Sequence, residues 1–478
     1  MKLKRSLLVP LLLLVAGCAV NPATGERELS LVSESQEIAM GREADPQISA
    51  QLGLVDNPEL QSYVSALGLR LAAVSERPGL PWTFRVIDDP TVNAFALPGG
   101  FIYVTRGILA HFDSEAELAG VLGHEIGHVT ARHSVSQISR QQLQQIGLGV
   151  GMVLSEDIRR VGGLLSAGMQ LMNLSYSRGD ETQSDELGLR YISREGYDPT
   201  SMIGVFEMLA QAGGGSEGRI PEWQLTHPYP ENRAENIRET IAEEGFPTDG
   251  TVARDRYLEH LDGMVFGEDP RQGYFKDTRF VHPELEFELT FPSGWQTINQ
   301  RTVVAAIEPG EEAVMTVEVA QDASDPVAAL REFLAQEGIA GGAVRQESTD
   351  GVAKARADFE ATTEGGTVRG EVAFVRHEGV TYRILGYGAS ASTWSSHAGR
   401  VAATISSFRT LNDRAILAVQ PWRLDIRSLS GATSLSSYLQ RNASPASIET
   451  LARINRVTPE EVMSSGRLIK WVTGEPLP

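Results

Sequence analysis

Two kinds of hydrophobic periodicity divide the chain. Before about residue 275, apolar residues recur every three or four positions in most segments, for example at 35–51 and 57–74, as on one face of an amphipathic helix. From His282 onward, apolar and polar residues alternate, which is typical of antiparallel strands. The expected strands are 285–289, 313–319, 353–359, 368–375 and 381–387, and the expected helices are 326–337 and 395–408. The pattern predicts an α+β, multidomain fold whose first half is mostly helical.

A short β-hairpin interrupts the helical half. Residues 92–97 and 101–104 have strand character, and the tight-turn sequence Pro98-Gly99-Gly100 separates them. We expect the first strand to be an exposed edge that pairs with the backbone of an extended peptide substrate, because a free sheet edge accepts an added strand. An internal strand pair is an equally good interpretation. The residues in question are Asn93, Ala94, Phe95 and Ala96.

The helix that follows this hairpin carries the strongest chemical pattern. The sequence His124-Glu125-x-x-His128 places two imidazoles one helical turn apart, within reach of a single Zn²⁺ ion, with a carboxylate beside them. Ser114, followed three residues later by Glu117, is a capping-box pattern that starts the helix. Gly123 and Gly127 are poor helix formers, so we expect another backbone or a substrate to approach the helix there. The alternative is a helix whose histidines are only core or surface residues.

A third zinc ligand must come from another segment, since a catalytic zinc ion keeps three protein ligands and one open position. The stretch 174–188 is expected to begin a second helix, on which Glu181 and Asp185 lie one turn apart. Glu181 is the expected third ligand, and Asp185 is expected to accept a hydrogen bond from the other ring N–H of a ligating histidine. The alternative is an acidic helix face exposed to solvent. With zinc in place, Glu125 is the expected general base for hydrolysis of peptide bonds.

These motifs occur with two others in a recognisable order. The four motifs are the hairpin at 93–105, His124-Glu125-x-x-His128, Glu181-x-x-Ser184-Asp185, and Leu225-Thr226-His227-Pro228-x-x-x-x-Arg233. Together they resemble the gluzincin peptidases of the BepA and LoiP kind, which are relatives of HtpX and the CaaX prenyl protease. The resemblance covers about residues 30–275. Ser184 stands where the family usually has alanine, and no 34-residue repeat of the kind that ends BepA is found here.

The resemblance implies roles for several residues. It implies one zinc ion per chain, held by His124, His128 and Glu181. His227 would be either a fourth zinc ligand that keeps the enzyme latent or a donor to the oxyanion of the reaction. Arg233 would pair with a carboxylate of the Glu181 segment, although an ordinary surface arginine is nearly as good an interpretation. The implied substrates are unfolded or misassembled envelope proteins.

Two apolar, glycine-rich segments lie between the zinc motifs, at 146–154 and 161–174. Neither reaches the length of about 20 apolar residues that spans a membrane, so we expect no transmembrane helix. The segments are expected to pack beneath the site or to form a lid. The sequence at 212–216 is rich in glycine and is expected to be a flexible loop before His227.

The N-terminal segment predicts export and lipid anchoring. Basic residues precede an apolar run at 7–15, as in a signal peptide, here assigned to 1–17. The run ends in a sequence that resembles a bacterial lipobox, in which Cys18, the single cysteine of the chain, is lipidated. Ala19 resembles the sorting signal for the outer membrane, and 18–34 would be a tether. The net charge of −20 argues against binding to nucleic acid.

The C-terminal half is expected to contain two further parts. The alternating segments belong to an α+β domain at 280–412 that has no catalytic constellation and would handle substrates or partners. Residues 415–478 weakly resemble a degenerate LysM unit, and this resemblance implies contact with peptidoglycan. A module that only caps the α+β domain is an equally good interpretation.

The sequence therefore predicts a periplasmic zinc metalloendopeptidase, lipid-anchored at the outer membrane, with its peptidase domain at 35–275. We expect it to degrade misfolded or misassembled envelope proteins. The competing hypothesis is an envelope assembly or chaperone-like factor whose zinc site is mainly regulatory. A base at Glu125 beside three ligands argues against that hypothesis, because a structural zinc site fills all four positions and needs no base.

Overall fold

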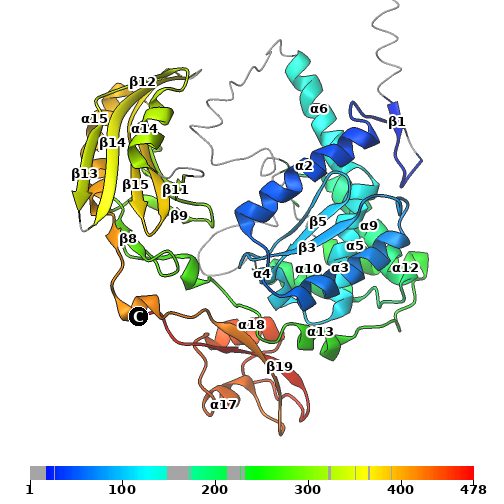
Figure 1. Ribbon diagram of the computed structural model, residues 1–478. Coiled ribbons are helices and arrows are strands. Elements are labelled where there is room, and N and C mark those ends of the chain that lie inside the picture. The colour runs from blue at the N-terminus through cyan, green and yellow to red at the C-terminus, as the bar shows by residue number, and fades with distance from the viewer. Residues whose placement is uncertain are drawn as a thin grey trace, which may run out of the picture. The chain divides into compact units, whose positions relative to one another are not determined.

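The computed structural model describes residues 18–25, 27–147, 171, 174–212, 227, 232–320, 325–349, 351–363, 366–388 and 390–478. Among these residues the chain forms two compact units. The first contains the residues up to Gly267 together with Trp422–Thr473, and the second contains Glu268–Pro421 and Gly474–Pro478. Helices and sheets occur in both (Figure 1), which confirms the predicted α+β class.

A three-stranded sheet forms the main β part of the first unit. Its strands are β3 (Thr83–Ile87), β4 (Ala94–Leu97) and β5 (Phe101–Thr105), in the order β3-β5-β4. β5 is parallel to β3 and antiparallel to β4, so the predicted hairpin is present. Gly99 and Gly100 have φ angles of 83° and 101°, a conformation that lets the chain reverse within this tight turn.

Several helices of the first unit begin at polar caps. The side chains of Ser33, Asn57, Ser114 and Ser177 each accept a hydrogen bond from a backbone N–H in the first turn. The helices are α2 (Glu34–Leu52), α3 (Pro58–Ala73), α4 (Arg106–His111), α5 (Glu115–Thr130), α6 (His133–Gly147), α9 (Arg178–Arg194), α10 (Ser201–Ala212), α12 (Arg233–Glu244) and α13 (Arg254–His260). A separate pair of short strands, β1 (Cys18–Val20) and β2 (Arg27–Leu29), precedes them.

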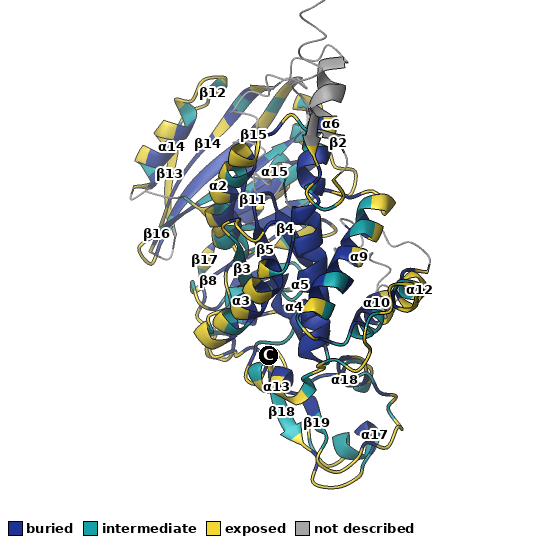
Figure 2. Ribbon diagram, turned by 90° about the vertical axis from the view of Figure 1, so that its right-hand side faces the viewer, coloured by how far each residue is buried: buried dark blue, intermediate teal, exposed yellow. Residues whose placement is uncertain are grey.

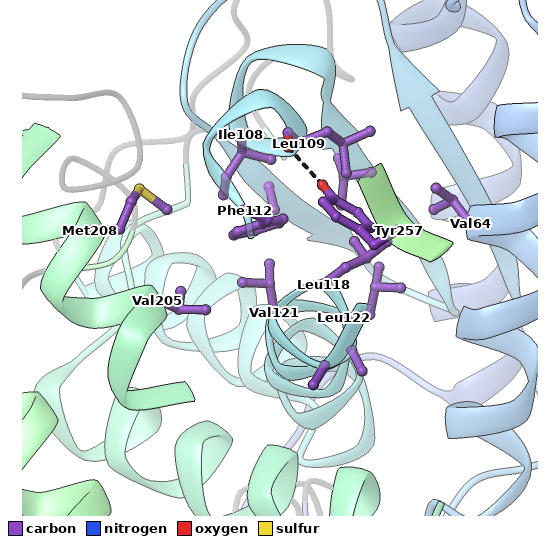
Figure 3. Close-up of a cluster of buried hydrophobic side chains, with 14 of the residues drawn as sticks. Val64, Ile108, Leu109, Phe112, Leu118, Val121, Leu122, Val205, Met208 and Tyr257 are labelled. Carbon is purple, nitrogen blue, oxygen red and sulfur yellow. Dashed lines mark hydrogen bonds between the residues drawn. The ribbon is translucent and has the colours of Figure 1, made fainter. Parts of the chain in front are cut away.

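Helix α5 lies in the core of the first unit. Every residue from Glu115 to Thr130 is buried, and α5 is accordingly dark blue along its length in Figure 2. Figure 3 shows Leu118 and Val121 among apolar side chains of neighbouring segments. In the same cluster the hydroxyl of Tyr257 donates a hydrogen bond to the backbone oxygen of Leu109, at 2.6 Å. A helix held on all sides has little freedom to move the groups that it carries.

Two glycines let helix α9 approach the backbone of α5. A Cβ atom on Gly127 would lie 3.0 Å from the Cα and the backbone oxygen of Ser184, and one on Gly123 would lie 3.2 Å from the Cα of Gly188. Of the two outcomes expected at these glycines, the structure therefore has the approach of another backbone. The small side chain of Ser184 fits the same close packing, which brings the acidic residues of α9 to the histidines of α5.

Residues Trp422–Thr473 belong to the first unit. They form two antiparallel strands, β18 (Arg423–Ser428) and β19 (Leu468–Thr473), with α17 (Leu435–Leu439) and α18 (Ile448–Asn455) between them. Trp471 is fully buried in the core that contains α5, and the ammonium group of Lys470 donates hydrogen bonds to the backbone oxygens of Ala110 and Phe112. The segment thus shares the hydrophobic core of the peptidase motifs. Whether it is a LysM-like module stays a prediction.

The second unit contains two antiparallel sheets. The larger has the order β12-β14-β15-β16-β11-β10-β9, with β13 paired to β14, and the smaller has the order β17-β8-β7-β6. The strands are β6 (Tyr274–Lys276), β7 (Arg279–His282), β8 (Phe287–Thr290), β9 (Gln296–Asn299), β10 (Val303–Ile307), β11 (Ala313–Val319), β12 (Ile339–Gly341), β13 (Arg345–Thr349), β14 (Val352–Thr363), β15 (Gly366–His377), β16 (Val380–Gly388) and β17 (Arg409–Thr410). The helices are η1 (Pro270–Gln272), α14 (Pro326–Leu334), α15 (Ala391–Ser407) and α16 (Arg414–Leu417). Each strand and helix predicted from the alternating pattern overlaps an observed one.

Some predictions concern segments outside the described residues. These are the signal peptide at 1–17, nearly all of the two apolar segments at 146–154 and 161–174, and the glycine-rich loop after Ala212. Within the part of the chain that the structure does describe, none of the helices combines the length and the apolar character that crossing a bilayer requires.

Candidate metal centre

Helices α5 and α9 supply most of the candidate site. His124 and His128 lie one turn apart on α5, and Glu181 lies in the first turn of α9. The start of α9 is set by Ser177, whose hydroxyl accepts from the backbone N–H of Asp180, while the Asp180 carboxylate accepts from the backbone N–H of Ser177. This cap fixes where α9 starts and therefore the position of Glu181 in its first turn. The side chain of Glu181 is fully buried.

Four possible metal ligands converge at one point. A donor atom from each of His124, His128, Glu181 and His227 lies within 4.8 Å of the other three. The Nε2 atoms of His124 and His128 are 3.0 Å apart, and Nε2 of His128 is 3.4 Å from Oε1 of Glu181. Nδ1 of His227 is 2.9 Å from the same carboxylate oxygen. All four residues are buried, so the sequence-predicted ligands are brought together with His227 beside them.

The chemistry of this cluster fits a zinc ion. Nitrogen and carboxylate oxygen donors in groups of three or four are the usual ligands of Zn²⁺. Of the three buried carboxylates, those of Glu181 and Asp185 contact the guanidinium of Arg233. With Glu125, Glu181 and Asp185 all ionised and the histidines neutral, the formal charge is −2, which a divalent cation cancels. Both carboxylate oxygens of Glu125 are buried and have no hydrogen-bond partner among the described residues. Such an orphaned carboxylate is costly unless a ligand or a water molecule occupies the site.

Arg233 and Asp185 support the ligands from behind. Oδ1 of Asp185 lies 2.9 Å from Nδ1 of His124, so this carboxylate can accept the ring proton of His124. Arg233 donates to Asp185 through Nε and Nη2, at 2.8 and 2.6 Å, and its Nη1 is 2.9 Å from Oε2 of Glu181. The guanidinium lies 4.2 Å above the ring of Phe206 and is buried. The alternative of an ordinary surface arginine is therefore wrong for Arg233.

Burial and neighbouring charge act in opposite directions on the titratable groups. Burial raises the pKa of Glu125 above its ordinary value. Burial alone would also raise the pKa of Glu181, but nearby His227 and His128 lower it well below its usual range. For His227, burial lowers the pKa, yet the carboxylates of Glu181 and Glu125 outweigh burial and raise it. A carboxyl with a raised pKa, as at Glu125, is suited to taking up and releasing a proton near neutral pH.

The predicted edge strand is at the edge of the described sheet, but it is not exposed. Each of Asn93, Ala94, Phe95 and Ala96 has at most 4 % of its surface exposed. The ring of Phe95 stacks on Tyr103 of β5 with 4.8 Å between the ring centres. Pairing of a substrate with this strand stays a prediction, and the strand would first have to be uncovered.

Two residues close to the ligands were not predicted from the sequence. The ring of Tyr176 stacks on that of His128, with 3.9 Å between centroids and 24° between planes. His133 contacts the same ligand from another side, because its Nδ1 lies 2.9 Å from Nδ1 of His128. No sequence pattern pointed to the contact of His133, because residues five apart lie on different faces of a continuous helix. The helix has to end between His128 and His133 for the two rings to meet.

Comparison with known proteins gives the family of this region. Residues 58–241 match the model of peptidase family M48. These residues form an M48 peptidase domain. All four motifs that carried the resemblance, from the hairpin to Arg233, lie within the matched residues. The predicted family is thereby confirmed, and the buried group of three histidines and one glutamate fits its zinc site.

Curated relatives share the M48 domain. The chain is 33% identical over 225 residues to the beta-barrel assembly-enhancing protease of Yersinia pestis. The matched region covers 45% of this chain and 46% of that protein. The protein of the same name from Escherichia coli K12 is 31% identical, with 45% and 46% covered. The mitochondrial metalloendopeptidase OMA1 of Schizosaccharomyces pombe is 32% identical, with 46% and 66% covered. The matched part is thus about half the length of the first two relatives.

Proposed function

We propose that this protein is a zinc metalloendopeptidase of the bacterial envelope. The observation that carries the proposal is the buried carboxylate of Glu125, which has no hydrogen-bond partner among the described residues, beside the three-residue ligand set of an M48 domain. A site that serves only to hold the fold together has no use for an acid–base group next to the metal. The competing hypothesis, an envelope assembly or chaperone-like factor whose zinc site is mainly regulatory, gives Glu125 no catalytic role.

His124, His128 and Glu181 would hold the zinc ion in this proposal. Bound zinc supplies a Lewis acid that lowers the pKa of a water molecule and polarises the scissile carbonyl. Glu125 accepts the proton of the attacking water and then returns it to the leaving amine nitrogen. Asp185 accepts a hydrogen bond from the ring N–H of His124, and Arg233 fixes the position of Asp185 by donating to it.

His227 is proposed as the latency ligand. Its Nδ1 lies 2.9 Å from Oε1 of Glu181 and 3.4 Å from Nε2 of His124, and its Nε2 lies 3.6 Å from Oε1 of Glu125. Its ring therefore takes up space between the other ligands and the base, where a substrate carbonyl has to enter. The alternative role, donation to the oxyanion, requires the ring to withdraw from Glu181 while it stays near the reacting carbonyl.

The proposed substrates are unfolded or misassembled envelope proteins. The support is the resemblance to relatives named beta-barrel assembly-enhancing proteases, which share the M48 domain. We further propose that Cys18 carries a lipid that anchors the protein in the periplasm at the outer membrane. The segment at 415–478 is proposed to contact peptidoglycan, and the domain at 280–412 to hold substrates or partners.

The test is a comparison of Glu125→Gln with the native protein. Cleavage of a dye-labelled unfolded protein should be lost, while the zinc content measured by metal analysis stays near one per chain, because the change removes a base and no ligand. Glu186→Gln is the matched control, since Glu186 is an exposed residue of α9. Loss of zinc together with activity would contradict the assigned role. Envelope proteins trapped on the Glu125→Gln variant would identify the substrates.

A further inference from the structure

His133 lies directly behind the zinc ligand His128. Helix α5 ends at Thr130, and α6 begins at His133. Between them, Arg132 has a φ of 58°, a left-handed conformation that turns the chain sharply. Its side chain holds this turn by donating to Glu37 at 3.0 Å and to the backbone oxygen of Val32 at 2.9 Å. The turn points His133 back toward the end of α5 and buries it to 3 % exposure.

The hydrogen bonds of His133 form a chain that ends on helix α9. Nδ1 of His128 lies 2.9 Å from Nδ1 of His133, and Nε2 of His133 lies 2.8 Å from Oε1 of Gln183. The hydroxyl of Ser184 is 3.3 Å from the same Nδ1 atom of His133. Each ring nitrogen of the pair thus faces a specific polar atom, although both rings are buried.

The direction of each hydrogen bond follows from the chemistry of the partners. A side-chain amide oxygen only accepts, so Nε2 of His133 must carry a proton to bond with Oε1 of Gln183. In the neutral form of His133, Nδ1 is then the acceptor, and it accepts a hydrogen bond from the Nδ1–H of His128. This arrangement leaves the lone pair of His128 on Nε2, the atom that faces His124 and Glu181 at 3.0 and 3.4 Å.

We propose that His133, oriented by Gln183, is a positioning residue that fixes the tautomer and the ring orientation of His128 for zinc. The proposal rests on the zinc site of the proposed function and deepens it. The two ligands of α5 are then supported differently. His124 is held by the carboxylate of Asp185, while His128 is held by an imidazole whose other nitrogen faces the amide of Gln183 and, at 3.8 Å, the carboxylate of Asp180. Partners of this kind orient the ligand ring and raise its affinity for the metal.

The first test is zinc affinity in the full chain, measured by competition with a metal-binding indicator. His133→Phe keeps a ring of similar shape but cannot accept the proton of His128, so the affinity should fall roughly 10- to 100-fold. His377→Phe is the matched control, because it makes the same change at a buried histidine of the second unit. Unchanged affinity and unchanged zinc release in His133→Phe would overturn the proposal.

Two variants of Gln183 separate positioning from a purely structural role. Gln183 is only partly buried, so its replacement is tolerated better than that of His133. Gln183→Leu removes the acceptor and should lower the zinc affinity in the same direction as His133→Phe, while Gln183→Glu keeps an acceptor oxygen and should restore most of it. Equal losses in the Leu and Glu variants would count against the proposed hydrogen-bond chain.

The tautomer itself can be observed. In the zinc-loaded protein, ¹⁵N chemical shifts of the histidine rings should show His133 protonated on Nε2 and His128 protonated on Nδ1. A proton on Nδ1 of His133 would overturn the proposal. These readouts are independent of proteolysis, so native protein that binds zinc but cleaves no unfolded substrate would refute the proposed peptidase function and leave the role of His133 intact.

Discussion

Arg233→Met should destabilise the first unit strongly, because Arg233 is the one described arginine in direct contact with both Asp185 and Glu181. It donates two hydrogen bonds to Asp185, and its Nη1 lies 2.9 Å from Glu181. Burial alone would raise the pKa of Asp185. The pKa nevertheless lies below its ordinary value, mainly because of the charge and hydrogen bonds of Arg233. Methionine fills a similar volume over the ring of Phe206 but leaves both carboxylates without this counter-charge.

The magnitude follows from the cost of an unpaired buried charge. Removing one partner of a buried ion pair costs about 3–5 kcal/mol. Loss of the contact with Phe206 adds about 1 kcal/mol. Because the total stability of a folded domain is about 5–15 kcal/mol, this change removes a large part of it. Arg233→Lys should cost less, since lysine keeps the charge but cannot bond to Asp185 with two parallel donors.

The assay is urea unfolding of the metal-free protein in the presence of a chelator, with the transition of the second unit as an internal reference. Asp185→Asn should recover part of the loss in the Arg233→Met background, because it removes the charge that needs a partner. The coupling energy between the two changes should be about 1–3 kcal/mol. A loss below about 1 kcal/mol in Arg233→Met, or strictly additive effects, would refute the assignment of a buried ion-pair network.

Three further predictions concern latency, helix packing and pH. His227→Ala should raise proteolysis and self-cleavage at unchanged zinc content if His227 blocks the site, and a fall in turnover of two or more orders of magnitude would establish the oxyanion role instead. Gly127→Ala should lower the free energy of unfolding by about 1–3 kcal/mol, because the added methyl group overpacks against Ser184. Gly399→Ala is in a helix with open space around it, so it should raise the free energy of unfolding by about 0.5–1 kcal/mol. Equal effects of the two changes in urea unfolding would contradict this packing. Burial lowers the pKa of Lys470 to about 7, so above that pH the unfolded chain binds a proton that the folded chain lacks, and stability should rise from about pH 7 toward the unfolded pKa. Lys470→Met should abolish that rise in pH-dependent unfolding curves, and an unchanged slope would contradict the assignment.

Local spacing along the chain determined much of the site. His124 and His128 on one helix, and Glu181 and Asp185 on another, are related by a single helical turn, so their side chains must lie on a common face. The serine caps before α5 and α9 are local in the same way, since each bonds to a backbone group three residues later. The change from helical to alternating periodicity likewise separated the helical first half from the sheets of the second unit.

Tertiary packing alone decided which distant segments meet. The place of His227 and Arg233 beside the ligands depends on how these two residues pack against α9, far from them in the sequence. The burial of β4, and of Trp471 in the core around α5, depends on neighbours far away in the sequence. Periodicity shows that a face is apolar, but it does not show which other face covers it. His133 illustrates the limit most directly: helical spacing alone would turn it away from His128, and the left-handed residue Arg132, which no sequence period reveals, brings the two rings together.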